Sequence, residues 1–383
     1  MSEAHAQLDV VIAAGGTAGH VNPALALAEE LVDRGHHVRF VGQRDRLEGE
    51  LVPKAGYELM PIVVRGFDRS RPWTLVTVLR RMAAAERVLG RDFDAGRAPD
   101  VAVGFGAYVE VPLMRWCRAH GVPCVLHEQN SVPGLANKIC ARWTRVVCVS
   151  FPAAAAVFEG RVKGGGEVVL TGNPVRRSVT AGSRAEARRS LGIPDDATVL
   201  LVFGGSLGAR HVNEGVARLK RELLSRERLY VLHSTGKGEH EATVERLALS
   251  DEERVRWRVV PYLDDMGGAY AACDLVLSRS GASSVAEIAA CAVPSILVPY
   301  PLATKDHQTT NAHYLTDAGA AVLVSDDDID TVGFSGTLLG LLDDPVRRNE
   351  MAAAARSLTQ ARAADALADR VEAAARGTSG SGV

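Results

Sequence analysis

The chain has 383 residues, a length that corresponds to two or three domains at ~100–200 residues per domain. Hydrophobic residues make up 47% of the chain and charged residues 23%, a composition that is ordinary for a globular protein and excludes a disordered one. The formal net charge of −2 argues against a dedicated nucleic-acid-binding protein, which would carry a basic excess.

A glycine-rich turn follows the first apolar run of the chain. Residues 8–14 predict a buried strand, residues 15–20 (GGTAGH) a turn, and residues 23–33 a helix. The same order recurs in the second half, where the apolar run 199–203 precedes the turn 204–208 (GGSLG) and another helical stretch. This repetition predicts two doubly wound α/β domains, each opening with a glycine-rich turn at the carboxyl edge of its sheet.

Short apolar runs between these landmarks predict further strands, alternating with helices as in parallel sheets. The predicted strands are 38–41, 101–104, 123–127 and 146–150 in the first half, and 229–234, 259–261, 275–278 and 295–299 in the second. Glycine, asparagine and proline break the periodicity at 171–176, which predicts the linker. The Ala-rich stretch 353–375 predicts a helix, and 377–383 a flexible tail.

The glycine-rich turns bring backbone N–H groups close to a helix N-terminus, where an anion can bind. Either turn taken alone is equally well explained by tight packing of a helix on a strand. The first turn is not G-x-G-x-x-G, and the strand after it ends at Gly42-Gln43 without an acidic residue for a ribose, which argues against a nicotinamide site. Neither turn ends in Gly-Lys-Ser/Thr, so a P-loop is also excluded.

A second informative stretch is 278–287 (SRSGASSVAE), which follows a predicted strand and opens a helix. Its hydroxyl and N–H groups suit phosphate oxygens, and Glu287, one turn inside the helix, suits vicinal ribose hydroxyls. The alternative is a capping arrangement, with Ser283 or Ser284 at the N-cap and Glu287 three residues further on. The two interpretations are compatible.

The six cysteines are sparse and lack C-x-x-C spacing, so we expect reduced thiols in the core rather than a disulfide scaffold. No Lys or Arg precedes Arg34, which argues against a signal peptide. The longest uncharged stretch, 288–304, contains three prolines and is not a membrane span. We therefore expect a soluble protein made in the cytoplasm.

Seven motifs together carry a resemblance to a known family. They occur in the order GGTAGHVNPALALAEEL, HEQN (127–130), GNPVR (172–176), GGSLGAR, YLDDM (262–266), SRSGASSVAE and DHQTTNA (306–312). Each motif is weak alone, but the ordered set, spanning about residues 8–371, resembles the MurG family. These are N-acetylglucosaminyltransferases that convert lipid I to lipid II in bacterial peptidoglycan synthesis. The resemblance implies the GT-B fold, in which two Rossmann-like parallel-sheet domains face each other across a cleft.

The implied domains are 1–172 on the acceptor and membrane side, 173–355 for the UDP-sugar, a C-terminal helix 356–376 that returns to the first domain, and the tail 377–383. The donor UDP-N-acetylglucosamine would lie mainly on the second domain. By the resemblance, Leu263 corresponds to the uracil contact, Ser206 and Arg176 to contacts near the diphosphate, and Gln308 to a contact with the transferred sugar. The residues that would wrap ribose and diphosphate are Ala282, Ser283, Ser284, Val285, Ala286 and Glu287.

In the first domain, Thr17, Ala18, Gly19 and Asn130 match family positions that line the donor or acceptor side. Ala18 departs from the family pattern, in which glycine is common, and its methyl group could restrict the approach of the acceptor diphosphate. The resemblance implies inverting transfer of N-acetylglucosamine to the 4-hydroxyl of the muramoyl sugar of lipid I. His20 is the best candidate for the base that this reaction needs, and the alternative is a neutral histidine that caps the turn. His127 and Glu128 are alternatives.

Substitution at an anomeric carbon passes through an oxocarbenium-like transition state, in which the departing UDP must be stabilised. The helix start after Gly281, with Ser206 and Arg176, can supply this stabilisation. No Asp-x-Asp stands where a metal–diphosphate bridge is expected, and the adjacent Asp264 and Asp265 predict a helix N-cap. We therefore expect neither a cofactor nor a metal.

A lipid-linked acceptor requires a docking surface at the cytoplasmic face of the membrane. Apolar and basic residues are interleaved in the stretch 65–82, opposed only by Asp68, a pattern that suits anionic lipid headgroups. A helix packed on the core with a solvated basic face is the alternative. The residues are Trp73, Leu75, Val76, Val78, Leu79 and Met82, with Arg65, Arg69, Arg71, Arg80 and Arg81.

Two other function classes compete with the lipid I transferase. One is another enzyme of the same fold, either a glycosyltransferase acting on diacylglycerol or a UDP-sugar epimerase. The other is a non-catalytic sugar-nucleotide-binding scaffold. The HEQN, GNPVR and DHQTTNA motifs favour the lipid I transferase over the other enzymes. The presence of both glycine turns with His20 and Glu287 argues against a scaffold.

Overall fold

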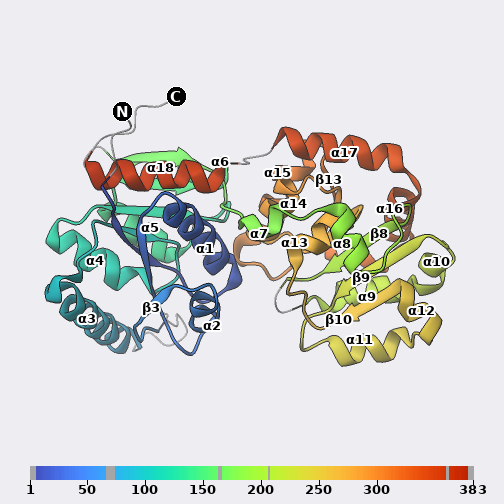
Figure 1. Ribbon diagram of the computed structural model, residues 1–383, viewed down its shortest axis with the longest axis horizontal. Helices are drawn as coiled ribbons and strands as arrows, with labels where there is room; N and C mark the ends of the chain where they lie inside the picture. The colour runs from blue at the N-terminus through green and yellow to red at the C-terminus, as the bar shows by residue number, and fades with distance from the viewer. Residues whose placement is uncertain (1–5, 66–73, 163–165, 206–207, 359–361, 378–383) are drawn as a thin grey trace. The chain divides into compact units, whose positions relative to one another are not determined.

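The computed structural model describes residues 6–65, 74–162, 166–205, 208–358 and 362–377 (Figure 1). The chain divides into two compact units. The first contains residues 1–176 together with 362–383, and the second contains residues 177–361. Each unit is built around its own parallel sheet.

The first unit has a seven-stranded sheet in the order β3-β2-β1-β4-β5-β6-β7, and every neighbouring pair is parallel. Its strands are β1 (Asp9–Ala13), β2 (His37–Gly42), β3 (Glu58–Pro61), β4 (Val101–Gly104), β5 (Cys124–Glu128), β6 (Val146–Val149) and β7 (Glu167–Leu170). The chain leaves β1 in opposite directions across the sheet, first to β2 and β3 and later to β4. The carboxyl ends of β1 and β4 therefore flank a topological switch point, the usual place for a ligand in such sheets.

Helices cover both faces of this sheet. The helices of the unit are α1 (Ala18–Asp33), α2 (Leu47–Lys54), α3 (Thr74–Asp92), α4 (Glu110–His120), α5 (Leu135–Cys140), α6 (Pro152–Phe158) and α18 (Ala363–Arg376), with short helical turns at Phe93–Arg97 and Ala141–Trp143. Alternate residues of β1 enter different cores. Val11 packs with residues of α3, α4, α5 and α6, whereas Ile12 packs with residues of α1, α2 and α18.

The last helix, α18, belongs to the first unit, and Figure 1 shows it in red on the half of the chain coloured blue to green. Arg34, just after α1, forms ion pairs with Asp365, Asp369 and Glu372 of α18. Glu372 also lies 3.1 Å from His36 Nε2. Apolar burial and this cluster of charges together hold α18 against α1.

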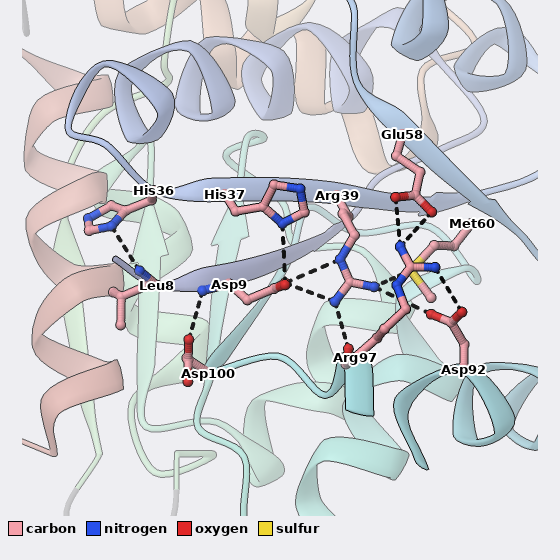
Figure 2. A network of polar contacts seen from close by, with 10 residues as sticks. All are labelled: Leu8, Asp9, His36, His37, Arg39, Glu58, Met60, Asp92, Arg97 and Asp100. Atoms are coloured by element: carbon pink, nitrogen blue, oxygen red, sulfur yellow. Dashed lines mark hydrogen bonds and ion pairs between the residues drawn. The ribbon is translucent and has the colours of Figure 1, made fainter. Parts of the chain in front are cut away.

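A buried arginine ties the strands together at the edge of the sheet where they begin (Figure 2). Arg39 of β2 is fully buried, and its Nη2 donates to Asp9 Oδ1 at 2.8 Å and to the backbone oxygen of Arg97 at 2.6 Å. Its Nη1 donates to Asp92 Oδ2 at 3.4 Å. The side chain of Arg97 is more exposed and pairs with Glu58 of β3 at 2.7 Å. The network fixes β1, β2 and β3 to the segment after α3.

The second unit has a six-stranded parallel sheet in the order β10-β9-β8-β11-β12-β13. Its strands are β8 (Thr198–Phe203), β9 (Leu229–Ser234), β10 (Trp257–Val260), β11 (Leu275–Ser278), β12 (Ser295–Leu297) and β13 (Ala321–Leu323). Its helices are α7 (Arg177–Thr180), α8 (Arg184–Ser190), α9 (Arg210–Arg218), α10 (Lys220–Leu224), α11 (His240–Leu247), α12 (Asp251–Arg256), α13 (Met266–Ala272), α14 (Ala282–Ala290), α15 (His307–Thr316), α16 (Val332–Asp343) and α17 (Pro345–Ser357), with 3₁₀ turns at Thr304–Asp306 and Asp326–Asp330.

The predicted fold class, two doubly wound α/β units with parallel sheets, is confirmed. The helix predicted to begin at residue 23 begins earlier, at Ala18, and accommodates Pro23 in its second turn. The helix predicted over 353–375 is wrong as a single element, because α17 ends at Ser357 and α18 starts at Ala363. Asp265 is the N-cap of α13 and accepts the Gly268 N–H at 2.8 Å, which confirms that prediction.

Candidate active site

A buried carboxylate that the sequence did not indicate fixes the first glycine turn by accepting a backbone N–H from it. Glu48 of α2 is fully buried, and its two oxygens accept the N–H groups of Gly16 (2.9 Å) and Gln43 (3.1 Å). A Cβ at Gly15 would lie 2.5 Å from Glu48 Oε1 and would displace the carboxylate from the turn, and the φ of +87° at Gly16 favours glycine. Because Glu48 uses the Gly16 N–H, anion binding here depends on the start of α1.

Three predicted residues lie together at that start. Thr17 is the N-cap of α1 with an extended backbone, and Ala18 and Gly19 are its first two helical residues. The N–H groups of a first helical turn have no partner within the helix, and they carry the positive end of the helix dipole. The turn therefore offers donors to an anion at Ala18 and Gly19. Their assignment to the donor or acceptor side stays a prediction.

His20 lies one residue further into α1 and is coupled to the N-cap. Its Nδ1 is 2.9 Å from Thr17 Oγ1, and a Cβ at Gly106 would lie 3.2 Å from its Cδ2 and Nε2. Burial of the imidazole lowers the pKa of His20 to about 4, although a hydrogen bond with the Gly15 backbone opposes this. His20 is therefore neutral near pH 7. It can accept a proton through Nε2 only in the tautomer whose Nδ1–H donates to Thr17.

A second buried carboxyl group shapes the turn against which His20 packs. Glu110, in the first turn of α4, accepts the Gly106 N–H at 2.7 Å through Oε2, and Gly106 has a φ of +86°. Burial raises the pKa of Glu110 to about 8, and the charge of Glu128 adds to the rise. A single acidic residue inside the apolar run 109–114 is the sequence signal that could have identified Glu110.

The two alternative bases, His127 and Glu128, are both occupied by hydrogen bonds at the end of β5. His127 Nε2 lies 2.8 Å from the Gly172 backbone oxygen, and its Nδ1 lies 3.0 Å from Gln129 Nε2. Burial lowers the pKa of His127 to about 4. With both ring nitrogens engaged, His127 joins β5 to the GNPVR segment. This arrangement favours a structural role over a role as base.

Glu128 organises the loop that follows β5. Its carboxylate accepts the N–H groups of Asn130 (3.0 Å) and Gly134 (2.9 Å) and the side-chain amide of Asn137 (2.9 Å). Burial raises the pKa of Glu128, and these hydrogen bonds oppose the rise. The predicted substrate residue Asn130 is thereby held half-buried at the same sheet edge as the first glycine turn.

Arg176 ends the GNPVR motif, and its Nε pairs with Glu29 Oε1 of α1 at 2.8 Å. For its predicted role near the donor diphosphate, the guanidinium of Arg176 must either bind the diphosphate while it keeps its contact with Glu29 or release Glu29 first. Ser206, the other predicted contact near the diphosphate, lies outside the described residues.

The start of α14 in the second unit presents open polar groups. Its N-cap is Gly281, which offers no side-chain cap, so the alternative cap at Ser283 or Ser284 is wrong. Both serines lie in the first helical turn, whose backbone N–H groups have no hydrogen-bond partner within the helix. The Oγ atoms of Ser280 and Ser283 are buried and have no hydrogen-bond partner within the described part of the chain. The helix start thus offers hydroxyl and N–H donors that a diphosphate would satisfy.

Glu287 lies further along α14, after Val285 and Ala286, and is mostly buried. The hydroxyl of Tyr270 donates to its Oε2 at 3.1 Å, and the Tyr270 ring packs edge-on against Phe203. Burial raises the pKa of Glu287 to about 7, and the hydrogen bond from Tyr270 opposes the rise. A carboxylate that is mostly buried and has one hydrogen-bond donor is suited to accept further hydrogen bonds from a ligand. Sequence reasoning did not identify Tyr270 as its partner.

Two more predicted contacts follow strands of the second sheet, one in a loop and one at the start of a helix. Leu263 is half-buried after β10. Gln308 is the second residue of α15 and accepts the Tyr300 N–H at 2.9 Å through Oε1, so its amide nitrogen remains a donor for a ligand. Just before it, Lys305 and Asp306 both have positive φ values, +56° and +53°. Strained backbone of this kind is concentrated at functional sites.

A buried arginine connects the loops of the second sheet. Arg279, in the SRSG segment, donates to the backbone oxygens of Val298 (3.3 Å) and Pro299 (3.0 Å) and pairs with Asp326 at 2.5 Å. Asp326 also lies 2.9 Å from His211 of α9. The start of α14 and the helix after the second glycine turn therefore share one carboxylate, an arrangement that the sequence did not reveal.

Two features are absent from the described residues. These residues contain no helix long and apolar enough to cross a lipid bilayer. They also contain no group of three or more His, Cys, Asp or Glu side chains placed to hold a metal ion.

Comparison with known proteins identifies the family. Residues 10–149 match the glycosyltransferase family 28 N-terminal domain, and residues 199–369 match the C-terminal domain of that family. The chain is 40% identical over 366 residues to the UDP-N-acetylglucosamine–N-acetylmuramyl-(pentapeptide) pyrophosphoryl-undecaprenol N-acetylglucosamine transferase of Nitratidesulfovibrio vulgaris, covering 94% of this chain and 96% of that protein.

Solved structures agree. The crystal structure of Acinetobacter baumannii MurG matches with a TM-score of 0.70 at 29% identity, covering 95% of this chain and 99% of that one. A putative UDP-N-acetylglucosamine 2-epimerase from Listeria monocytogenes matches with a TM-score of 0.69 at 14% identity, covering 98% of each chain, and so shares the fold alone. With both domain models and a full-length relative in agreement, the chain belongs to the MurG family of GT-B glycosyltransferases.

Proposed function

We propose that this protein transfers N-acetylglucosamine from UDP-N-acetylglucosamine to the 4-hydroxyl of the muramoyl sugar of lipid I, giving lipid II. The observation that carries the proposal is the 40% identity, over nearly the full length of both chains, to the N-acetylglucosamine transferase of Nitratidesulfovibrio vulgaris. The epimerase and the diacylglycerol transferase remain the rival enzymes, but the likeness to an epimerase is one of fold, at 14% identity.

The second unit holds the donor in this proposal. The open start of α14 receives the diphosphate oxygens through the N–H groups and hydroxyls of Ser283 and Ser284. Glu287 accepts the ribose hydroxyls, and Gln308 donates to the transferred sugar. As the bond between sugar and UDP breaks, negative charge grows on the diphosphate. The helix dipole of α14 stabilises that charge more strongly in the transition state than in the bound donor.

The first unit supplies the base. The 4-hydroxyl of the acceptor attacks the anomeric carbon, its proton passes to Nε2 of His20, and the electron pair of the broken bond leaves with UDP. Attack from the face opposite UDP inverts the anomeric centre. The neutral state of His20 supports this role, because an imidazolium could not accept the proton. In the tautomer that this role requires, the Nδ1–H donates to Thr17 Oγ1.

The acceptor places the enzyme at the cytoplasmic face of the membrane, held peripherally by α3. Val76 and Leu79 of α3 are 57% and 53% exposed, and three residues apart they share one side of the helix. Arg80 beside them is exposed as well. Val78 and Met82 instead pack toward the core, so they are not part of such a surface. Trp73, Arg69 and Arg71 lie outside the described residues.

A panel of acceptors tests the proposed function against its rivals. The purified protein is incubated with UDP-N-acetylglucosamine and a short-chain lipid I analogue, with diacylglycerol, or with no acceptor. We expect UDP release and a disaccharide product with the lipid I analogue only. Transfer to diacylglycerol, or conversion of the donor to its 2-epimer without an acceptor, would establish the corresponding rival instead.

A further inference from the structure

A pocket of about 400 Å³ opens in the first unit beside the first glycine turn. Its walls come from the segments that follow four neighbouring strands. Gly16 follows β1, Gln43 and Arg46 follow β2, Arg65 follows β3, and Tyr108 follows β4. Because these strands are parallel and adjacent, the pocket lies at the carboxyl edge of the sheet, at the switch point. Its volume is within the range of small-ligand sites.

The pocket has a cationic wall. Arg46 and Arg65 are exposed, and neither forms an ion pair within the described chain. The buried carboxylate of Glu48, which contacts two residues of the pocket, is already taken by the N–H groups of Gly16 and Gln43. Two guanidinium groups that have no acidic partner among the described residues favour an anionic ligand, and guanidinium binds a carboxylate or phosphate through paired hydrogen bonds.

The remaining walls favour a peptide over a bare pyrophosphate. The Gly16 N–H, which a phosphate would otherwise use, is bonded to Glu48. Val64 and the Tyr108 ring give the pocket apolar surface suited to small aliphatic side chains. Gln43 accepts the Val64 N–H at 3.1 Å through Oε1, so its amide nitrogen remains a donor for a peptide carbonyl. Aliphatic contact, an amide donor and two arginines together match a short peptide that bears a carboxylate.

We propose that this pocket binds the peptide stem of the acceptor, with a stem carboxylate held by Arg46 and Arg65. The proposal rests on the proposed function, because only an acceptor that carries a peptide would use such a pocket. It makes the two arginines specificity-determining residues that act on acceptor binding and not on the chemical step.

The test uses two soluble short-chain acceptor analogues in the absence of membranes, one with the pentapeptide and one without it. Arg46→Gln and Arg65→Gln are compared with Arg44→Gln, a neighbouring exposed arginine that does not line the pocket. Each pocket variant should raise KM for the pentapeptide acceptor about tenfold, the effect of losing one charge-assisted hydrogen bond partly screened by water. KM for the peptide-free acceptor and for UDP-N-acetylglucosamine should stay unchanged, as should all constants of Arg44→Gln.

An equal rise in KM for both acceptors would overturn the proposal and assign the arginines to the pyrophosphate. An effect seen only in binding to lipid vesicles would assign Arg65 to the membrane surface. If the wild-type protein turns over neither acceptor, the proposed function fails. Direct binding of a fluorescent pentapeptide acceptor then still decides the pocket, which is supported only if the Arg46→Gln/Arg65→Gln double variant loses that binding and Arg44→Gln does not.

Discussion

Replacing Glu287 with Gln should weaken donor binding and at the same time stabilise the protein. The carboxylate is mostly buried, with the Tyr270 hydroxyl as its one hydrogen-bond donor among the described residues. A charge-assisted hydrogen bond to ribose is worth roughly 1.5–3 kcal/mol, so UDP affinity should fall about ten- to hundredfold. Isothermal titration calorimetry with UDP at pH 8, where the wild-type carboxyl is ionised, measures this loss.

The stability effect has the opposite sign. The pKa of Glu287 is raised from 4.5 to about 7, so its contribution to stability is fully present below pH 4.5 and is lost as the pH rises through about 7. At about 1.4 kcal/mol per pKa unit, ionisation costs the free protein on the order of 3 kcal/mol. Glutamine does not ionise, so Glu287→Gln should melt at a higher temperature than the wild type at pH 8 and at a similar temperature at pH 5.

Tyr270→Phe sharpens the same test. Loss of the hydroxyl removes a hydrogen bond that lowers the pKa of Glu287, so the pH below which UDP affinity falls should move upward. The thiols of Cys273 and Cys291, the other titratable groups near this pair, are neutral because burial raises the pKa of each to well above the working range. If Glu287→Gln binds UDP as tightly as the wild type at pH 8, the assignment of this carboxylate to the ribose is wrong.

Three further predictions concern the base, the sheet and the membrane. His20→Gln should lower kcat by roughly 10²–10⁴-fold with unchanged UDP affinity. Because the pKa of His20 is about 4, the wild-type kcat/KM should not fall between pH 8 and pH 5 through protonation of this group. A midpoint near pH 6.5 that is assigned to His20 would contradict the lowering of its pKa by burial. Arg39→Met should lower the free energy of unfolding, measured in urea, by about 3 kcal/mol, because it removes the buried cation from this network. Arg97 belongs to the same network but is exposed, so Arg97→Gln should lower the free energy of unfolding by less than about 1 kcal/mol (Figure 2). Equal losses for the two variants would refute the argument from burial. Leu79→Ser should reduce binding to anionic vesicles, whereas Val88→Ser, at an exposed position two and a half turns further along the same helix, should not. Equal losses would point to a general effect on α3.

The sequence predicts the interior of each sheet better than its edges. The three strands that the apolar pattern misses, β3, β7 and β13, all lie at an edge of their sheet. The burial of β7 is incomplete along its length, and β3 begins with an exposed Glu58 and ends in Pro61. An edge strand is paired on one side only and needs no continuous apolar run, so composition alone does not distinguish it from a loop.

The candidate site is predictable where it depends on local sequence and not where it depends on distant contacts. The glycine turns and the start of α14 follow from strand–turn–helix spacing. Glu48 and Glu110 do not, because each acts by accepting a backbone N–H from a turn that the fold brings to it. The alternative cap at Ser283 or Ser284 follows the pattern of a capping box, serine with glutamate a turn later, but the N-cap is Gly281, which leaves the helix start open. The low pKa of His20 depends on burial that no motif encodes.

The structure of the disaccharide product tests the central claim most directly. The protein is incubated with UDP-N-acetylglucosamine, whose sugar is α-linked, and the short-chain lipid I analogue, and the product is examined by mass spectrometry and proton NMR. The account predicts a gain of one N-acetylhexosamine, attached through a β linkage to the 4-position of the muramoyl sugar, with an equal amount of UDP released. An α linkage, attachment at another hydroxyl, or hydrolysis of the donor without transfer would contradict it.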